Sequence, residues 1–173
     1  ELGGKDSLIV LEDADMERAT SAANFGSFMH QGQICMSAGR ILVHERIAGE
    51  LVRRVAQKAD KLPVGNPATE EVALGPLINA AQVEHCHGIV QDSVAAGAVL
   101  EAGGSYEGLF YRPTVLSAVT RGVRAFDEEI FGPVACVSTF ASDDEAVALA
   151  NDTDYGLSAA IISPSLGRAR SLG

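Results

Sequence analysis

The sequence predicts an α/β domain in which helices surround a mostly parallel sheet. Short apolar runs alternate with helical patterns along the whole chain, as they do in successive strand–helix–strand units. No linker or low-complexity stretch divides the 173 residues, a length typical of one domain. Hydrophobic residues make up 47% of the chain and charged residues 21%, which is the balance of a globular protein with a buried core.

Strands are expected where a short apolar run is bounded by turn-forming or charged residues. The first run is Leu-Ile-Val-Leu, which ends at an acidic pair, and the second is Ile-Leu-Val, which follows a Gly-Gln loop. The run from Val134 to Phe140 is a stronger candidate than those at 98–101 and 114–116. In chain order, the expected strands cover 8–11, 41–43, 98–101, 114–116, 134–140 and 157–163.

Helices are expected between these strands, from apolar residues at helical spacing and from capping signals. Asp13 or Asp15 caps the first helix, which is rich in alanine. Ser142 and Glu145 have the spacing of a capping box, a hydroxyl acceptor followed three residues later by a carboxylate. The expected helices run to about residue 30, over 46–60, over 79–96 with Gly97 as the stop, over 142–151 and from about 164, and an irregular segment spans 63–77.

Charge and cysteine usage exclude several classes of protein. The net charge of −10 and the pI near 4.7 argue against a nucleic-acid or anionic-membrane surface. No apolar run approaches the roughly 20 residues that span a bilayer. The three cysteines are far apart and form no CxxC pair, so we expect reduced thiols in a cytoplasmic protein rather than disulfides or a thiolate zinc site.

The sharpest local signal is a cysteine in a loop of small residues. Cys35 lies in Gly32-Gln-Ile-Cys-Met-Ser-Ala-Gly-Arg40, between an expected helix and an expected strand. Small neighbours leave its sulfur reachable, and backbone N–H groups in such a loop can point at an oxygen that develops negative charge. A lone cysteine is more often a buried structural residue, and only the wider context favours a nucleophile here.

That context is a set of three motifs, Glu1-Leu-Gly-Gly-Lys5, Gly32-Gln-Ile-Cys35 and Glu128-Glu-Ile-Phe-Gly-Pro-Val134. Together they resemble the motifs of the aldehyde dehydrogenase superfamily of NAD(P)-dependent enzymes. The separation of 34 residues between Glu1 and Cys35 is also typical of the family. Further family-like stretches extend the resemblance over essentially the whole chain. The resemblance implies a three-layer α/β/α catalytic domain with a mostly parallel sheet.

The resemblance assigns two catalytic residues. It makes Cys35 the nucleophile, which attacks the aldehyde carbon to give a thiohemiacetal and, after hydride transfer to the nicotinamide, a thioester. Its oxyanion is held in part by the Cys35 backbone N–H. Glu1 is then the general base that activates the water for hydrolysis of the thioester, a role typically worth about 10²–10⁴ in rate. Without the resemblance, Glu1 is an exposed terminal carboxylate.

Cofactor and substrate contacts are implied in the same way. Glu129 is expected to bind the ribose hydroxyls beside the nicotinamide, and Phe131 to lie next to that ring. Leu2 and Gly3 are expected close to the cofactor, because glycine lets the backbone approach a ligand. The apolar residues that flank the nucleophile are expected to line a substrate tunnel: Met29, Ile34 and Met36. For Met29, a place in the helix core is an equally good interpretation.

Other interpretations compete with these. His30 lies five residues before Cys35, so a cofactor-independent cysteine hydrolase is the alternative, and a non-catalytic module with a coincidental cysteine is a third hypothesis. The His85-Cys86-His87 run does not predict a metal site, because helical residues one and two apart point in different directions.

The sequence lacks a GxGxxG loop for dinucleotide phosphates. The resemblance therefore implies that residues 1–173 are a catalytic-domain fragment, expected to be inactive alone, without the dinucleotide-binding domain and the C-terminal oligomerisation segment. The parent is expected to use NAD or NADP and to form a dimer or tetramer. The stretch from His30 to Met36 resembles the branch that acts on benzaldehyde, vanillin and related aromatic aldehydes. Its apolar Ile and Met residues suit a flat ring, and an aliphatic aldehyde is the alternative substrate.

Overall fold

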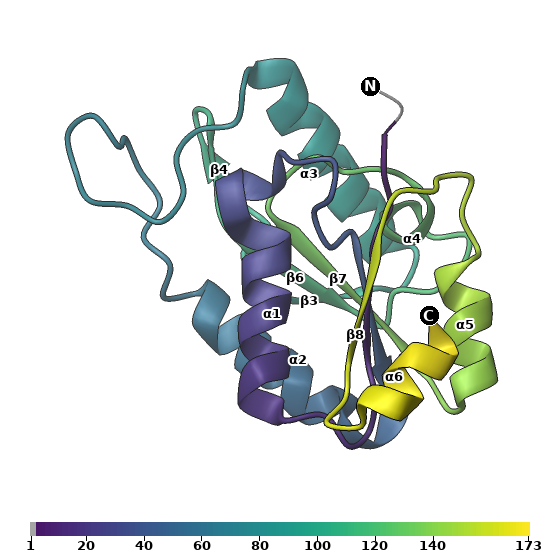
Figure 1. Ribbon diagram of the computed structural model, residues 1–173. Coiled ribbons are helices and arrows are strands. Elements are labelled where there is room, and N and C mark those ends of the chain that lie inside the picture. Colours follow the sequence, from purple (N-terminus) through teal and green to yellow (C-terminus); the bar gives the residue numbers. More distant parts are fainter. Residues whose placement is uncertain (1–2) are drawn as a thin grey trace.

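The computed structural model describes residues 3–173, which form a six-stranded sheet with helices on both faces (Figure 1). The strand order is β3-β6-β7-β2-β1-β8, and every pair is parallel except β3 with β6. The strands are β1 (Ser7–Val10), β2 (Arg40–His44), β3 (Val99–Ala102), β6 (Thr114–Ser117), β7 (Val134–Phe140) and β8 (Ala159–Ile162). The predicted mostly parallel α/β fold is confirmed.

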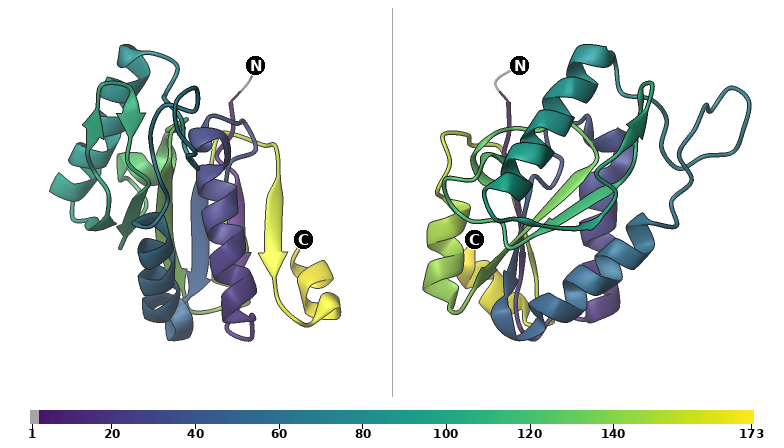
Figure 2. Two further views of the ribbon diagram at one scale, coloured as in Figure 1. Left: turned by 90° about the vertical axis from the view of Figure 1, so that its left-hand side faces the viewer. Right: turned by 180° about the vertical axis from the view of Figure 1, so that it is seen from behind.

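Helices cover the sheet in two layers. α1 (Met16–Phe28) and α2 (Glu45–Ala59) lie to the left of the central strands in Figure 1, and α5 (Asp143–Ala150) lies to their right. The left-hand view of Figure 2 brings α1 and α2 to the front. The remaining helices are α3 (Ala80–Ala95), α4 (Arg124–Asp127) and α6 (Leu166–Leu172).

Alternation along the strands divides the core in two. In β1, Leu8 and Val10 pack in the cluster under α1 and α2, while Ile9 packs in the cluster on the opposite face. Successive strand residues point to opposite faces of a sheet, so a central strand buried on both sides reads as a continuous apolar run. Because β1 lies between two other strands and is buried on both faces, the sequence shows a continuous apolar run there.

The predicted caps differ in detail from the observed ones. Asp15, one of the two candidates, caps α1 by accepting from the N–H of Arg18 at 2.8 Å. Ser142 caps α5, but the Glu145 carboxylate accepts from Ala141, one residue before the cap, rather than from Ser142 itself. Asp15 and Ser142 each satisfy a backbone N–H group that a helix start leaves unpaired.

Three short elements were not predicted. They are the hairpin of β4 (Tyr106–Glu107) and β5 (Phe110–Tyr111), the helix α4, and the 3-10 turn η1 (Met29–Gly32). The first helix also ends at Phe28 rather than at residue 30, because His30 and Gln31 have positive φ angles of 49° and 60°. Left-handed residues cannot continue an α-helix, and here they turn the chain toward the loop of Cys35.

Candidate active site

The loop of Cys35 joins α1 to β2 and is fastened to the end of the helix. The backbone N–H of Ala38 and the hydroxyl of Ser37 both donate to the carbonyl oxygen of Gly26, each at 2.9 Å. The loop therefore folds back over the last turn of α1. Cys35 is partly exposed, whereas Cys86 and Cys136 are buried.

Two glycines allow three remote segments to meet at this loop. A Cβ atom added to Gly4 would lie 2.5 Å from the carbonyl oxygen of Cys35. One added to Gly32, which has a φ of +65°, would lie 2.1 Å from the carbonyl oxygen of Gly132. Backbone contacts this close exclude any side chain, so both positions require glycine.

Glu129 connects the last motif to the first. Its Oε1 accepts a hydrogen bond of 2.8 Å from the backbone N–H of Gly4. Gly3 lies against the same carboxylate and against the ring of Tyr155. Glu129 and Phe131 line a small cavity of about 20 Å³ together with Cys35 and Ile34.

Neighbouring side chains hold this segment in place. Arg124 donates to both carboxylate oxygens of Glu128, at 2.6 and 2.8 Å, and this pairing keeps the pKa of the Glu128 carboxyl below its usual value. Glu128 is thereby turned to α4 while Glu129 reaches the cleft. From α3, the Gln82 side chain donates to the carbonyl oxygens of Ile130 and Phe131 at 2.9 and 3.0 Å.

The His85-Cys86-His87 run has three separate surroundings. His85 Nε2 lies 3.2 Å from the carbonyl oxygen of Glu129, and His87 Nδ1 lies 3.1 Å from the hydroxyl of Tyr111. Cys86 is buried in the core. Within residues 3–173, no group of three His, Cys, Asp or Glu side chains is placed to hold a metal ion.

Across the same residues, no helix has both the length and the apolarity needed to cross a membrane.

Arg40 connects the backbone at Lys5 to the end of α5 through hydrogen bonds. Its guanidinium is buried and donates to the carbonyl oxygens of Lys5, Leu149, Ala150 and Asp152 at 2.8–3.2 Å. The acceptors after Lys5 belong to the end of α5, where unpaired carbonyls attract a cation. Arg40 therefore fixes the strand after Gly4 relative to the segment that carries Tyr155.

The residues predicted for the site fall into three groups. Cys35, Glu129, Phe131 and Ile34 come together at the cleft, with Gly3 beside Glu129. Met29 and Met36 do not line that cavity and are 42% and 63% exposed, so the reading of Met29 as helix core is wrong. Glu1 and Leu2 lie outside the described residues.

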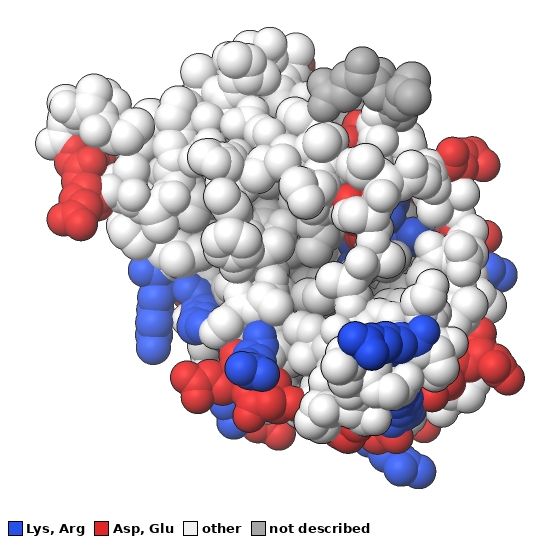
Figure 3. Space-filling view, viewed as in Figure 1, with Lys and Arg blue, Asp and Glu red and all other residues white. Residues whose placement is uncertain are grey.

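Sequence reasoning missed two residues, one on the helix that precedes the Cys35 loop and one that lines the Cys35 cavity. Phe25, on the last turns of α1, is 66% exposed and lies in a stretch without charged residues, from 19 to 39. Figure 3 shows the upper part of this face, over the end of α1, largely free of charge. Lys5 is buried beside the cleft, and a terminal motif gave no sign of that burial.

Comparisons with known proteins agree with this geometry. The model of the aldehyde dehydrogenase family matches residues 1–173. The chain is 56% identical over 172 residues to a vanillin dehydrogenase of Amycolatopsis sp., covering 99% of this chain and 35% of that protein. It is 47% identical over 166 residues to a benzaldehyde dehydrogenase [NAD(+)] of Pseudomonas putida, covering 96% and 34%.

The fold is likewise similar to solved structures. A crystal structure of betaine aldehyde dehydrogenase from Staphylococcus aureus in complex with NAD+ superimposes with a TM-score of 0.95 at 34% identity, over 99% of this chain and 35% of that one. Lactaldehyde dehydrogenase from Escherichia coli gives a TM-score of 0.95 at 38% identity, over 99% and 37%. The chain thus spans about a third of the length of the proteins it matches.

Proposed function

This chain belongs to the aldehyde dehydrogenase family, and from this premise we propose that it is the catalytic domain of an enzyme that oxidises an aldehyde to a carboxylic acid with NAD or NADP. The observation that carries the proposal is the meeting of Cys35 and Glu129 at one cleft. A partly exposed thiol beside a carboxylate that is held by backbone suits covalent catalysis next to a bound cofactor.

Cys35 is the proposed nucleophile. Its thiolate attacks the aldehyde carbon, and the oxygen of the resulting thiohemiacetal becomes negatively charged. Within residues 3–173 the backbone N–H of Cys35 donates to no acceptor, so it is available to that oxygen. After loss of hydride the carbon is a thioester, which water hydrolyses with Glu1 as the proposed base.

The described residues fit the nicotinamide half of a dinucleotide. Glu129 uses one oxygen for Gly4, and a carboxylate has about four lone-pair sites, so it retains acceptors for ribose hydroxyls. Phe131 lines the cavity of Cys35 and offers an apolar surface to a ring. The chemistry that a bound nicotinamide supplies is acceptance of a hydride. The names of two relatives mention NAD, which favours NAD over NADP.

An aromatic aldehyde is the proposed substrate. Relatives at 41–56% identity are named for vanillin, benzaldehyde and salicylaldehyde. The surface of α1 and its loop is uncharged from residue 19 to 39 and exposes Phe25, Met29 and Met36. Such side chains contact a flat ring without leaving a polar group unpaired.

We further propose that the whole protein is a cytoplasmic homodimer or homotetramer. Light scattering would test its oligomeric state.

The test uses the whole protein that contains this chain. Cys35→Ala should abolish aldehyde-dependent formation of NADH while dinucleotide binding survives, because every covalent intermediate needs the sulfur. Glu1→Gln should give a burst of about one NADH per chain followed by slow turnover, because the thiolate still attacks while the water lacks its base. Rapid-mixing absorbance measures both.

His30→Asn is the matched control. His30 is exposed and has a φ of 49°, a left-handed conformation that asparagine tolerates, so the substitution should leave turnover unchanged. Hydrolysis that depends on His30 and needs no cofactor would favour the cysteine hydrolase instead. Full activity of Cys35→Ala would exclude both enzymes and leave the non-catalytic module.

A further inference from the structure

Lys5 carries a buried amine. Its side chain is 2% exposed, and Nζ meets no acceptor within residues 3–173. The stem passes over Gly39, where an added Cβ would lie 3.1 Å from Lys5 Cδ. The loop of Cys35 thus ends in a residue that leaves room for this lysine. An unpaired buried amine costs free energy unless water or a proton acceptor reaches it.

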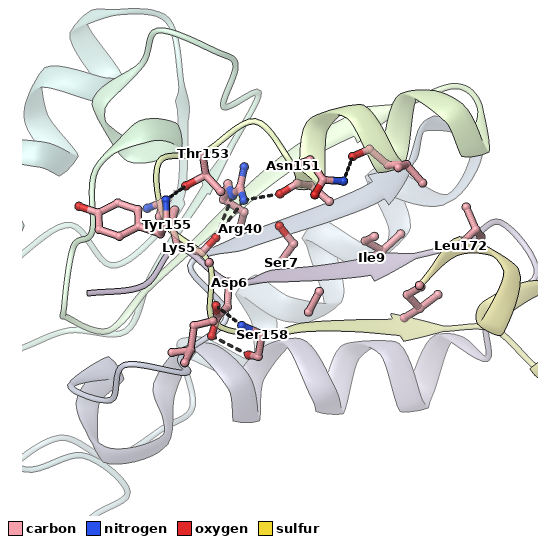
Figure 4. Close-up of a pocket in the computed structure, with 17 residues that line it drawn as sticks. Lys5, Asp6, Ser7, Ile9, Arg40, Asn151, Thr153, Tyr155, Ser158 and Leu172 are labelled. Carbon is pink, nitrogen blue, oxygen red and sulfur yellow. Dashed lines mark hydrogen bonds between the residues drawn. The ribbon is translucent and has the colours of Figure 1, made fainter. Parts of the chain in front are cut away.

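Lys5 stands between two cavities. It lines the cavity of about 20 Å³ that holds Cys35 and Glu129, and it lines a second cavity of about 340 Å³ between β1, β8 and α5. Among the described residues it is the one that lines both. Figure 4 shows Lys5 at one end of the second cavity, next to Arg40 and Tyr155.

The second cavity is suited to water. Lys5, Ser7 and Ile9 alternate along the chain and face it from one side of β1. The hydroxyl of Ser7 is likewise buried, and nothing in the described part of the chain hydrogen-bonds to it. Asn151, Thr153 and Ser158 add polar groups to the wall. The small cavity itself is large enough for one water molecule, which needs about 10–15 Å³.

We propose that Lys5 relays protons between the cleft of Cys35 and Glu129 and a water chain in the second cavity, with Ser7 as the next group on the route. The inference rests on the proposed function, because thioester hydrolysis is what supplies the protons. Water and a thioester give a carboxylate, the Cys35 thiolate and two protons. The neutral amine accepts a proton through the small cavity and, as an ammonium, passes it to water beside Ser7.

The surroundings of Lys5 are consistent with a relay. Burial lowers its pKa, so the neutral amine is available at lower pH than for an ordinary lysine. The titratable groups around the amine are Cys136 on β7, Arg40 on β2, Asp127 in α4 and Glu129 just after α4. Cys136 and the two carboxylates raise the pKa and Arg40 lowers it, and burial exceeds them all.

The test needs no cofactor. In the whole protein, p-nitrophenyl acetate should acylate Cys35 with a burst of p-nitrophenolate, and the later steady rate reports hydrolysis of the acetyl thioester. Lys5→Met keeps the length of the stem and should leave the burst unchanged while slowing the steady rate at least about tenfold. Lys5→Arg should be as slow, because a guanidinium does not give up its proton. Lys58→Met, on the exposed face of α2, should match the wild type.

The outcomes separate the possible roles. A wild-type rate in Lys5→Arg would show that positive charge suffices and would overturn the relay, as would a wild-type rate in Lys5→Met. If neither variant folds, the steady rate of the wild type is measured in mixtures of H₂O and D₂O, and its dependence on the deuterium fraction tests the relay. A relay moves more than one proton, so the rate should curve with deuterium fraction, and a straight line overturns it. A Cys35→Ala variant that hydrolyses the ester at the wild-type rate would instead overturn the proposed nucleophile.

Discussion

The carboxylate of Glu129 accepts a hydrogen bond of 2.8 Å from the backbone N–H of Gly4, across 125 residues of sequence. This contact joins the first and last motifs at the loop of Cys35. It orients one carboxylate oxygen, and the other accepts no hydrogen bond from residues 3–173. Its neighbour Glu128 is held by Arg124 instead, so two adjacent glutamates have different surroundings.

Glu129→Gln should weaken dinucleotide binding about tenfold. The amide keeps an oxygen for Gly4 but loses the charge that strengthens a hydrogen bond to ribose, a loss of about 1.5 kcal/mol. Glu107→Gln is the control, since this exposed carboxylate on β4 does not line the cleft of Cys35 and its substitution should change affinity by less than about twofold. Titration of NADH fluorescence in the whole protein measures both. Equal effects would remove Glu129 from the cofactor site.

Gly4→Ala should lower kcat/KM at least about 100-fold, because the new Cβ would displace the Cys35 carbonyl and misplace the nucleophile. Gly49→Ala is the matched control. Gly49 lies within α2 with nothing within 4 Å of an added Cβ, so alanine should stabilise the protein by about 0.5–1 kcal/mol. Steady-state kinetics and urea unfolding give the two readouts. An active Gly4→Ala enzyme would contradict the described packing.

Iodoacetamide at pH 8 should label Cys35 alone. Burial raises the pKa of the Cys86 thiol to about 12 and also raises that of Cys136, so neither forms the reactive thiolate at that pH. Cys35 is partly exposed on its loop. Mass spectrometry should find one adduct per native chain, and three after unfolding in urea. Native adducts at Cys86 would show that the core beside Gly132 opens.

Lys5→Met should raise the melting temperature, and the gain should shrink as the pH rises. The pKa of Lys5 is lowered in the folded state, so the unfolded chain binds the proton more tightly. The penalty for burying the ammonium is therefore full below the folded pKa. It disappears between that pKa and the ordinary value of 10.5. Calorimetry at pH 7 and pH 10 tests this, and a gain that grows with pH would contradict the sign of the shift.

The order and type of the main elements followed from local patterns. Apolar runs and helical spacing predict strands and helices because side-chain direction repeats every two residues in one and every 3.6 in the other. Asp15 and Ser142 mark helix starts through contacts with residues three positions away, which a sequence displays directly. The loop of Cys35 was visible for the same reason, since small residues surround it.

Contacts between remote segments were decided by the tertiary structure. Residue type alone does not distinguish Glu129 from Glu128; the motif resemblance singled out Glu129, and contacts with Gly4 and Arg124 send the two side chains to different sides. Met36 flanks the nucleophile in sequence but is exposed, whereas Lys5, a charged residue, is buried. The β4–β5 hairpin was missed because its strands are two residues long, too short for any periodicity to appear. By itself the sequence determined which chemistry-bearing residues are present and on which elements. Their distances, burial and partners depend on how parallel strands far apart in the chain align.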